Sequence, residues 1–298
     1  MLDLRQTSEY AKYMKAIGWI VDGKLGSFAY IKKFPIIGSF IKIQRPEIIS
    51  DKAIMRLSKK YRAFQIVIEP KSTVHGSLLT EHGFHQSRSY FVPSKTIHID
   101  LTSSERRLLT DMHYKTRYNI KKAMSNKLQV TSSKDIDGFA NFWQKCAREQ
   151  RGMFLSMKKE MTGLYNAFRK NAYIITVSRH PERPEGVEGS HQSYRHAEKN
   201  NLLSGILLIH TKDIAYYMYA ASTVKGKKLF APTLNAWEAI KLSKKLGCKV
   251  FDFEGIYDDR FPIKSWLGFT RFKRSFGGNV IGYPGTYHKF LLPFRLFR

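Results

Sequence analysis

The stretch from Tyr216 to Gly278 decides the fold predicted for this chain. It contains four segments: YYMYAAST (216–223), APTLNAWEAIKLSKKLGC (231–248), KVFDFEGI (249–256) and RFKRSFGG (271–278). The first and third predict strands, and the second, with Pro232 in its first turn and apolar residues at helical spacing, predicts a helix. The fourth is basic and ends in two glycines, which predicts a loop. We expect this ordered set to form one unit that carries a site.

The chain upstream alternates helical and strand-like segments in the same way. Helices are predicted over 7–17, 50–61, 72–82, 135–150 and 159–171, and strands over 26–35, 37–46, 63–70, 94–101, 128–133 and 172–179. A longer helix is predicted from the capping box of Thr102 and Glu105 to Ser125, with one strongly basic face. The polar segment 179–201 predicts an exposed insertion between two strands.

The pattern of helices and antiparallel strands restarts near residue 130. It predicts an α+β architecture with two domains rather than a doubly wound parallel sheet. We place the first domain at residues 1–129 and the second at 130–279. The terminal YHKFLLPFRLFR (287–298) predicts either a further strand or a segment that contacts an anionic membrane.

Composition limits the class of protein. The 298 residues are 43% hydrophobic, enough for a real core, and 51 Lys plus Arg against 24 Asp plus Glu give a formal charge of +27. Such a surface attracts polyanions, which include nucleic acid, nucleotide-linked substrates and anionic membranes. Two distant cysteines, Cys146 and Cys248, argue against a disulfide framework and indicate a reducing cytoplasm. The sequence shows no signal-peptide pattern and no apolar run of membrane-spanning length.

Common catalytic motifs are missing from the sequence. It has no phosphate-binding P-loop, no dinucleotide-binding glycine fingerprint, no H-E-x-x-H and no G-x-S-x-G. The closest approach to an acetyl-coenzyme A loop is RPEGVEG (183–189), whose spacing is wrong. His191 and His196 lack acidic or cysteine partners at fixed spacing, so no metal is expected. We therefore predict no cofactor.

Polar groups at strand ends and in RFKRSFGG remain as candidate site residues. A fixed ammonium such as Lys273 can stabilise negative charge on an acyl oxygen or a departing alkoxide. Tyr217 and Tyr219 alternate with their neighbours along a strand, which predicts that they share one face. Asp252 and Glu254 share the parity of an otherwise apolar strand, so at least one is expected to make a specific hydrogen bond or salt bridge.

These segments together resemble the Fem family of non-ribosomal peptidyl transferases. The resemblance runs from QTSEYAKYMKAIGW (6–19) through IKIQRP, IVIEP and TIHIDLTSSERRLLTDMHYKTRYNIKKA to the four segments quoted first. It implies two GNAT-like (acyl-CoA N-acyltransferase-like) domains with mixed, mostly antiparallel sheets, and a segment 280–298 that returns to the first domain. The chain has no long charged heptad region, so it resembles the compact branch without a coiled-coil arm.

The resemblance also implies which residues act. The catalytic candidates are Lys273, its neighbour Phe272, and Glu69, which is a possible general base or only an orienting group. The candidates for binding a peptidoglycan precursor are Lys12, Lys15, Tyr217, Tyr219, Asp252 and Glu254. The family's phosphate-binding arginine falls near Ser156 or Met157, so Arg151 or Lys158 would replace it here.

The implied reaction is aminolysis of an ester. An amine of the precursor's stem peptide attacks the carbonyl of aminoacyl-tRNA, and the ribose hydroxyl leaves. The implied partners are aminoacyl-tRNA and a lipid-linked or UDP-linked precursor, met by a monomer in the cytoplasm or at the inner face of the plasma membrane. The candidates for tRNA backbone contacts are Arg117, Lys121, Lys122, Lys225, Lys227 and Lys228. The alternatives are aminoacylation of a protein N-terminus or a lipid, and a non-catalytic module that binds RNA or membranes.

Overall fold

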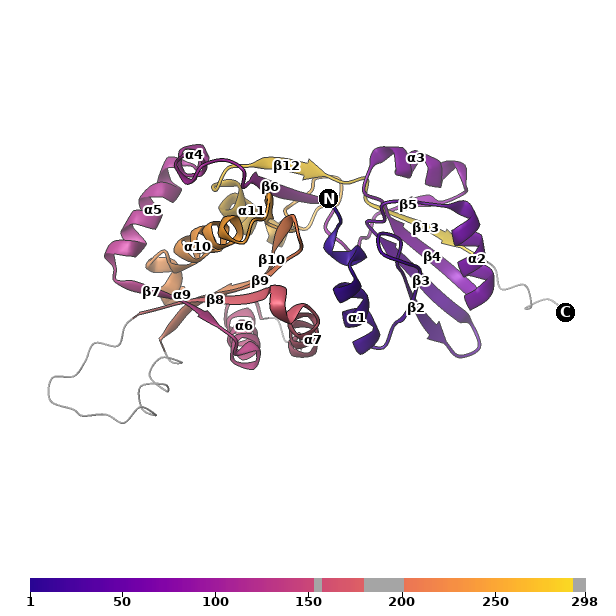
Figure 1. The fold of residues 1–298 in the computed structure, drawn as a ribbon, viewed down its shortest axis with the longest axis horizontal. Coiled ribbons are helices and arrows are strands. Elements are labelled where there is room, and N and C mark those ends of the chain that lie inside the picture. The colour runs from indigo at the N-terminus through magenta and orange to yellow at the C-terminus, as the bar shows by residue number, and fades with distance from the viewer. Residues whose placement is uncertain (153–156, 180–200, 292–298) are drawn as a thin grey trace. The chain divides into compact units, whose positions relative to one another are not determined.

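A computed structural model describes residues 1–152, 157–179 and 201–291 of the chain. They form two compact units, each with its own mixed sheet and helices (Figure 1), which confirms the α+β prediction. Unit 1 comprises Met1–Ile97, Glu254–Thr270 and the chain from Val280, and unit 2 comprises His98–Phe253 and Arg271–Asn279. Residues 180–200 of the insertion predicted over 179–201, and the end of the chain from residue 292, lie outside the described residues.

The sheet of unit 1 has six strands in the described residues. Their order is β1 (Ile20–Asp22), β2 (Ala29–Phe34), β3 (Gly38–Gln44), β4 (Ala63–Glu69), β13 (Thr286–Phe290) and β5 (His85–Ser87). The β3–β4 pair is parallel and the other neighbouring pairs are antiparallel. The strand β13 therefore lies between β4 and β5, although its residues come almost 200 positions after β5.

Helices pack on both faces of this sheet. On one face, α2 (Asp51–Tyr61) and α3 (Thr73–Glu81) bury apolar side chains such as Ile54 and Leu79 against β2, β3 and β4. The N-cap of α2 is Ser50, whose hydroxyl accepts a hydrogen bond from the Ala53 amide. The other face meets α1 (Ser8–Ala16), which follows a short 3₁₀ turn (Leu4–Gln6). A second 3₁₀ turn, Lys264–Trp266, lies in the later part of unit 1.

The second sheet, most of which belongs to unit 2, has seven strands in the described residues. Their order is β12 (Asn279–Gly282), β6 (Lys95–Asp100), β11 (Val250–Asp252), β10 (Ile214–Ser222), β9 (Leu202–His210), β8 (Ala172–Arg179) and β7 (Leu128–Ser133). The helices of unit 2 are α4 (Glu105–Asp111), α5 (Tyr114–Ser125), α6 (Ile136–Arg151), α7 (Lys158–Phe168) with the turn Arg169–Asn171, α9 (Val224–Lys228) and α10 (Ala231–Lys245). The helix α11 (Leu267–Arg274) belongs to unit 2 from Arg271. α5 and α10 cover one face and α6 and α7 cover the other (Figure 1).

The structure divides the chain at a different place from the predicted boundary at residue 129. Unit 2 begins at His98 because the second half of β6 pairs with β11, and α5 packs against α10. The segment Glu254–Thr270 belongs to unit 1, although the sequence prediction assigned it to the second domain. The main chain therefore passes between the units several times.

The long helix predicted over 102–125 is wrong and is two helices. The N-cap is Ser104, not Thr102, and α4 ends where Met112 adopts an extended backbone and turns its side chain into the core. The side chain of Arg117 then donates to the carbonyls of Leu109 and Thr110, near the end of α4, and of its C-cap Met112. The burial of the Met112 side chain and the capping hydrogen bonds from Arg117 stabilise the break between the two helices more than the backbone hydrogen bonds of one continuous helix would.

The predicted loop RFKRSFGG is also wrong. Its first four residues are the end of α11, and the turn starts only after Arg274. Gly277 and Gly278 have φ of 82° and 84°, and a Cβ on Gly277 would lie 2.8 Å from the Asp111 carbonyl oxygen. A glycine is needed there because the turn packs directly against the end of α4.

Candidate functional site

A lysine and a group of aromatic rings form the first candidate site, inside unit 2. Lys273 of α11 is 9% exposed, and its Nζ lies 5.9 Å from the ring centroid of Tyr217 on β10. The Tyr217 ring contacts Phe253 at 5.4 Å, and Phe253 contacts Phe276 at 5.4 Å. Phe272, half-buried, packs on Phe276. An ammonium among rings, with little water, acts strongly on any charge that develops beside it.

Tyr217 contributes a neutral phenol to this cluster. Burial raises the pKa of the Tyr217 phenol well above its ordinary value. The side chain therefore stays protonated at physiological pH, and it can donate a hydrogen bond but cannot neutralise Lys273.

The second predicted tyrosine lies on the other face of the sheet. Tyr217 pairs with Leu208 and Tyr219 pairs with Leu207, because the register shifts between the two tyrosines. Cross-strand partners share a face, so this bulge breaks the alternation and the predicted common face is wrong. Tyr219 packs on Trp143 of α6 at 6.1 Å.

A histidine–aspartate pair lies on the same face as Tyr219. Asp252 is paired with Tyr216 across β10 and with His98 across β6. The Nε2 of His98 is 3.1 Å from the Asp252 carboxylate. Sequence reasoning missed His98, although a histidine within the apolar strand TIHIDL was a signal. The prediction that at least one of Asp252 and Glu254 makes a specific polar contact is confirmed.

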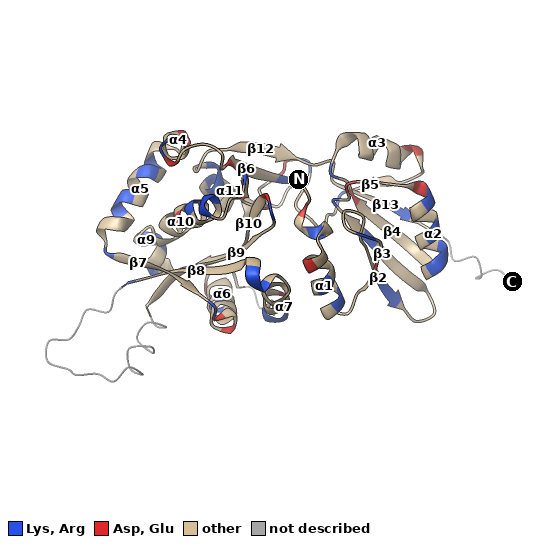
Figure 2. Cartoon of the chain, in the orientation of Figure 1, with Lys and Arg blue, Asp and Glu red and all other residues tan. Residues whose placement is uncertain are grey.

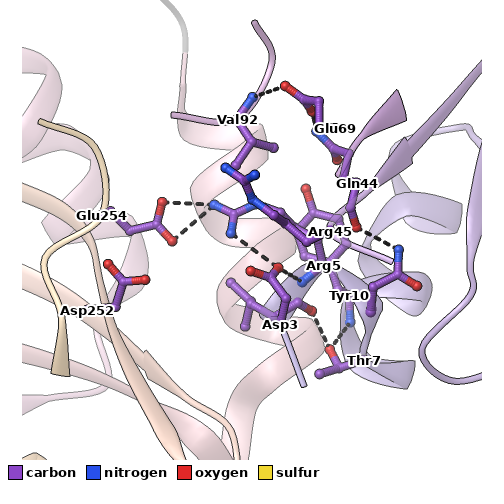
Figure 3. Close-up of polar contacts among 12 residues, drawn as sticks. Asp3, Arg5, Thr7, Tyr10, Gln44, Arg45, Glu69, Val92, Asp252 and Glu254 are labelled. Atoms are coloured by element: carbon purple, nitrogen blue, oxygen red, sulfur yellow. Dashed lines mark hydrogen bonds and ion pairs between the residues drawn. The ribbon is translucent and has the colours of Figure 1, made fainter. Parts of the chain in front are cut away.

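Unit 1 holds a buried ion-pair cluster centred on Arg5 (Figure 3). The Arg5 guanidinium makes two hydrogen bonds to Glu254, at 2.8 and 3.0 Å, and one to Asp3 at 3.3 Å. Burial acts to lower the pKa of Arg5, but the charges of Glu254 and Asp3 outweigh it and raise the pKa well above its ordinary value. Glu254 has a left-handed backbone, φ 57°, which the ion pair holds in place.

Glu69, at the end of β4, is 2% exposed and tied into the framework of unit 1. Its carboxylate accepts hydrogen bonds from the amides of Phe91 and Val92 at 2.8 and 2.7 Å. It also accepts hydrogen bonds from the side chains of Gln44 and Thr286 at 2.9 and 3.1 Å. A carboxylate held by four donors joins β3, β4, β13 and the 91–92 loop.

Lys42, on the same face of β3 as Gln44, was missed by the sequence analysis. Its Nζ lies 4.4 Å from the ring centroid of Trp19. Burial lowers the pKa of the Lys42 ammonium to about 8, against the opposing effect of the Glu69 charge. Near neutral pH a fraction of this amine is uncharged.

The low pKa of Lys42 predicts a specific dependence of stability on pH. Above pH 8 Lys42 in the folded protein releases a proton that the unfolded chain still binds up to about pH 10.4. The free energy of unfolding therefore increases as the pH rises through this window. Urea unfolding at several pH values measures this effect. Between pH 7 and pH 10.5, the free energy of unfolding of wild type should rise by up to about 3 kcal/mol relative to that of Lys42→Met. Lys12→Met changes an exposed lysine, and its free energy of unfolding should depend on pH in the same way as that of wild type. Equal pH profiles for wild type and Lys42→Met would show that Lys42 is not perturbed.

The other predicted precursor-binding residues lie on helices of both units. Lys12 and Lys15 are exposed on α1 of unit 1. Lys158, the first residue of α7 in unit 2, forms an ion pair with Asp137 at 3.1 Å. Arg151 is the last residue of α6, and Ser156 lies outside the described residues.

The predicted tRNA contacts fall into two groups within unit 2. Lys121 and Lys122 are exposed on α5, whereas Arg117 is occupied as the cap of α4. The second group is exposed on α9: Lys225, Lys227 and Lys228. Lys227 donates a hydrogen bond to Gln150 of α6. Both groups place positive charge on helices of unit 2 (Figure 2).

Neither a metal-binding cluster nor a membrane-spanning helix occurs within residues 1–152, 157–179 and 201–291. No group of three or more His, Cys, Asp or Glu side chains in these ranges is arranged to hold a metal ion. None of the helices in that part of the chain combines the length and the apolar character needed to cross a membrane.

Known structures share this fold. The chain is similar to the crystal structure of FemX, with a TM-score of 0.78, 19% identity, and coverage of 97% of this chain and 92% of that one. It is also similar to the C-terminal domain of a protein from Agrobacterium fabrum named as a putative lysylphosphatidylglycerol synthetase (TM-score 0.57, 11% identity, 96% and 88% coverage). A tandem GNAT protein from the clavulanic acid pathway gives a TM-score of 0.50 at 7% identity, with 89% and 82% coverage.

These similarities show a fold of two GNAT-like domains, as predicted. No curated protein gives a significant match to the chain. Residues 179–296 match the model of the FemAB family, which supports the resemblance to the Fem family found in the sequence. The matched region contains Tyr217, Tyr219 and Lys273.

Proposed function

We propose that this protein transfers an amino acid from aminoacyl-tRNA to the side-chain amine of a peptidoglycan precursor's stem peptide. The single observation that carries the proposal is Lys273, a buried ammonium beside Tyr217 within the region that matches the FemAB family. An amino-acid ester that reacts there would place its growing negative charge next to a fixed cation. A preorganised cation of this kind lowers the barrier to acyl transfer.

The proposed reaction balances without a metal or an organic cofactor. The amine nitrogen attacks the ester carbonyl carbon, a C–N bond forms, and the C–O bond to the ribose breaks. The amine loses a proton, and the ribose oxygen gains one as it leaves. The tRNA ester is already activated, so positioning of the two substrates supplies much of the acceleration.

Glu69 acts as a positioning residue in this proposal rather than as a general base. Both of its oxygens accept hydrogen bonds from fixed donors of unit 1, two of them backbone amides. It would have to break these contacts to accept a proton from the incoming amine. Its buried carboxylate instead fixes the loop 91–92 against the end of β4.

Both proposed substrates are polyanions, which fits the basic composition. The tRNA would meet the lysines of α5 and α9, and the precursor's diphosphate would meet the exposed Lys12 and Lys15 or the α6–α7 region with Arg151 and Lys158. Such contacts position the substrates without reading their sequence.

A transfer assay with several acceptors tests the proposal. Purified protein would be mixed with tRNA carrying radiolabelled amino acids and, in separate reactions, UDP-linked precursor, lipid-linked precursor, a peptide with a free N-terminus, or phosphatidylglycerol vesicles. We expect label in a precursor product, identified by mass spectrometry of the stem peptide. Labelling of only the peptide or the lipid would contradict the proposed acceptor, and binding of tRNA without transfer to any of them would contradict the proposed activity.

A further inference from the structure

The outward face of α5 in unit 2 combines exposed tyrosines with lysines. Its inward positions Thr116, Ile120 and Ala123 are buried. The outward face carries Tyr114 and Tyr118, one turn apart and 62% and 60% exposed. Residues four apart on a helix are neighbours, so the two rings form one surface. Burying one face and exposing two large rings on the other is unusual for a helix that only covers a core.

Positive charge is interleaved with these rings. Lys121 and Lys122 continue the stripe by one further turn, and both are exposed. Lys115 places its Nζ 5.9 Å from the Tyr114 ring centroid. No ion pair engages Lys121 or Lys122 in the described residues. The blue segments along α5 in Figure 2 mark the Lys and Arg positions of this helix.

The tyrosine end of the stripe lies against the segment that carries Lys273. The ring of His113 stacks on Tyr114, with centroids 4.6 Å apart. The His113 amide donates to the Ser275 carbonyl at 2.9 Å, two residues beyond Lys273. A linear polyanion that follows α5 from Lys122 to Tyr114 thus reaches the end of α11.

We propose that this face of α5, from His113 to Lys122, binds unpaired nucleotides at the end of an RNA. Bases would stack on Tyr114 and Tyr118, while Lys121 and Lys122 contact phosphates, as in single-strand binding sites built from aromatic rings and cations. The inference rests on the proposed function, because it assigns the acceptor end of the tRNA to this surface. It differs from a backbone contact with duplex RNA, whose stacked bases are inaccessible to tyrosine rings.

The distribution of residues favours RNA over a membrane surface. A helix that lies in a membrane interface separates a continuous apolar face from a basic face. In α5 the apolar side is already packed in unit 2, and the exposed side mixes tyrosine with lysine. Stacking on tyrosine with phosphate neutralisation by lysine uses both residue types on one face.

Fluorescence anisotropy with uncharged RNA tests the proposal. The probes are a labelled hairpin with a four-nucleotide single-stranded 3′ end and the same hairpin with a blunt end. The double variant Tyr114→Ala/Tyr118→Ala should bind the first probe about 10-fold or more weakly. Its affinity for the blunt probe should stay within about two-fold of wild type. Tyr114→Phe/Tyr118→Phe keeps both rings and should bind like wild type.

The lysines should give a different result in the same assay. Lys121→Gln/Lys122→Gln should weaken binding of both probes and reduce the slope of log affinity against log salt by about 0.7 for each single-strand phosphate that is no longer neutralised. The tyrosine variants should leave that slope unchanged. Wild-type affinity of the Ala double variant for the single-stranded end would overturn the proposal, as would tyrosine-dependent binding to anionic vesicles in place of RNA.

These measurements need no amino-acid transfer, so they separate the inference from the proposed function. An enzyme that transfers normally with both tyrosines replaced by alanine would retain the function and exclude this RNA site. Tyrosine-dependent RNA binding without transfer would retain the site and exclude the function.

Discussion

Replacing Lys273 with alanine is expected to reduce amino-acid transfer by at least about 100-fold, the usual effect of removing one group that stabilises an oxyanion. The loss should appear in the rate constant of a single turnover with saturating aminoacyl-tRNA, because the cation acts on charge that develops in the transition state. Rapid-quench measurement of labelled product gives this rate directly.

Two variants separate charge from packing at this position. Lys273→Met keeps a buried linear side chain without the ammonium, so it should be as inactive as the alanine variant while retaining more stability. Arg274→Ala removes the adjacent, exposed cation and should keep transfer within about three-fold of wild type. Wild-type turnover by Lys273→Met would exclude the assigned role of the ammonium.

Replacing Arg5 with alanine is expected to lower the free energy of unfolding of unit 1 by about 3–5 kcal/mol. The change would leave the carboxylates of Asp3 and Glu254 buried without their cation, and it would release the left-handed backbone of Glu254. Urea unfolding followed by hydrogen exchange of β2 and β3 amides would locate the loss in unit 1.

Arg56 provides a matched control for this prediction. Its ion pair with Asp22 has the same 2.8 Å separation as the closest Arg5–Glu254 contact, but the Arg56 side chain is 53% exposed. Arg56→Ala should therefore lower the free energy of unfolding much less than Arg5→Ala does. Adding Glu254→Gln to Arg5→Ala removes a buried charge that has lost its partner. The double variant should therefore recover part of the free energy of unfolding that Arg5→Ala loses. Equal effects of the two arginine changes would contradict the role given to burial.

Local pattern was enough to predict most elements of the fold. The helix α2 follows from its N-cap Ser50 and its apolar spacing, and α10 begins within one residue of the predicted Pro232. The strand β4 is a short apolar run that ends on Glu69, as predicted. These segments are determined by residues close in sequence, so periodicity and capping identify them.

Features that depend on distant residues could not be predicted in the same way. The break between α4 and α5 requires Arg117 to cap carbonyls eight and fewer residues earlier and requires burial of Met112. The bulge that separates Tyr217 from Tyr219 depends on pairing with β9. The His98–Asp252 contact joins strands 154 residues apart. Periodicity contains no information on these pairings.

For the candidate catalytic residues too, the sequence predicted the residue but not its surroundings. Lys273 was predicted from a resemblance over matching segments, whereas its aromatic surroundings come from β10, the chain after β11 and the turn after α11. The sequence named Glu69 as a possible base, and only the structure shows the four donors that occupy it.

The place of β13 determines the order in which a newly made chain can fold. β13 fills the gap between β4 and β5, but residues 286–290 leave the ribosome after nearly all of unit 2. Until then β4 and β5 expose unpaired edges, which invite pairing with another chain. The unit whose synthesis starts first therefore completes its sheet last, and a nascent chain that stalls before Thr286 would be released with an aggregation-prone N-terminal half.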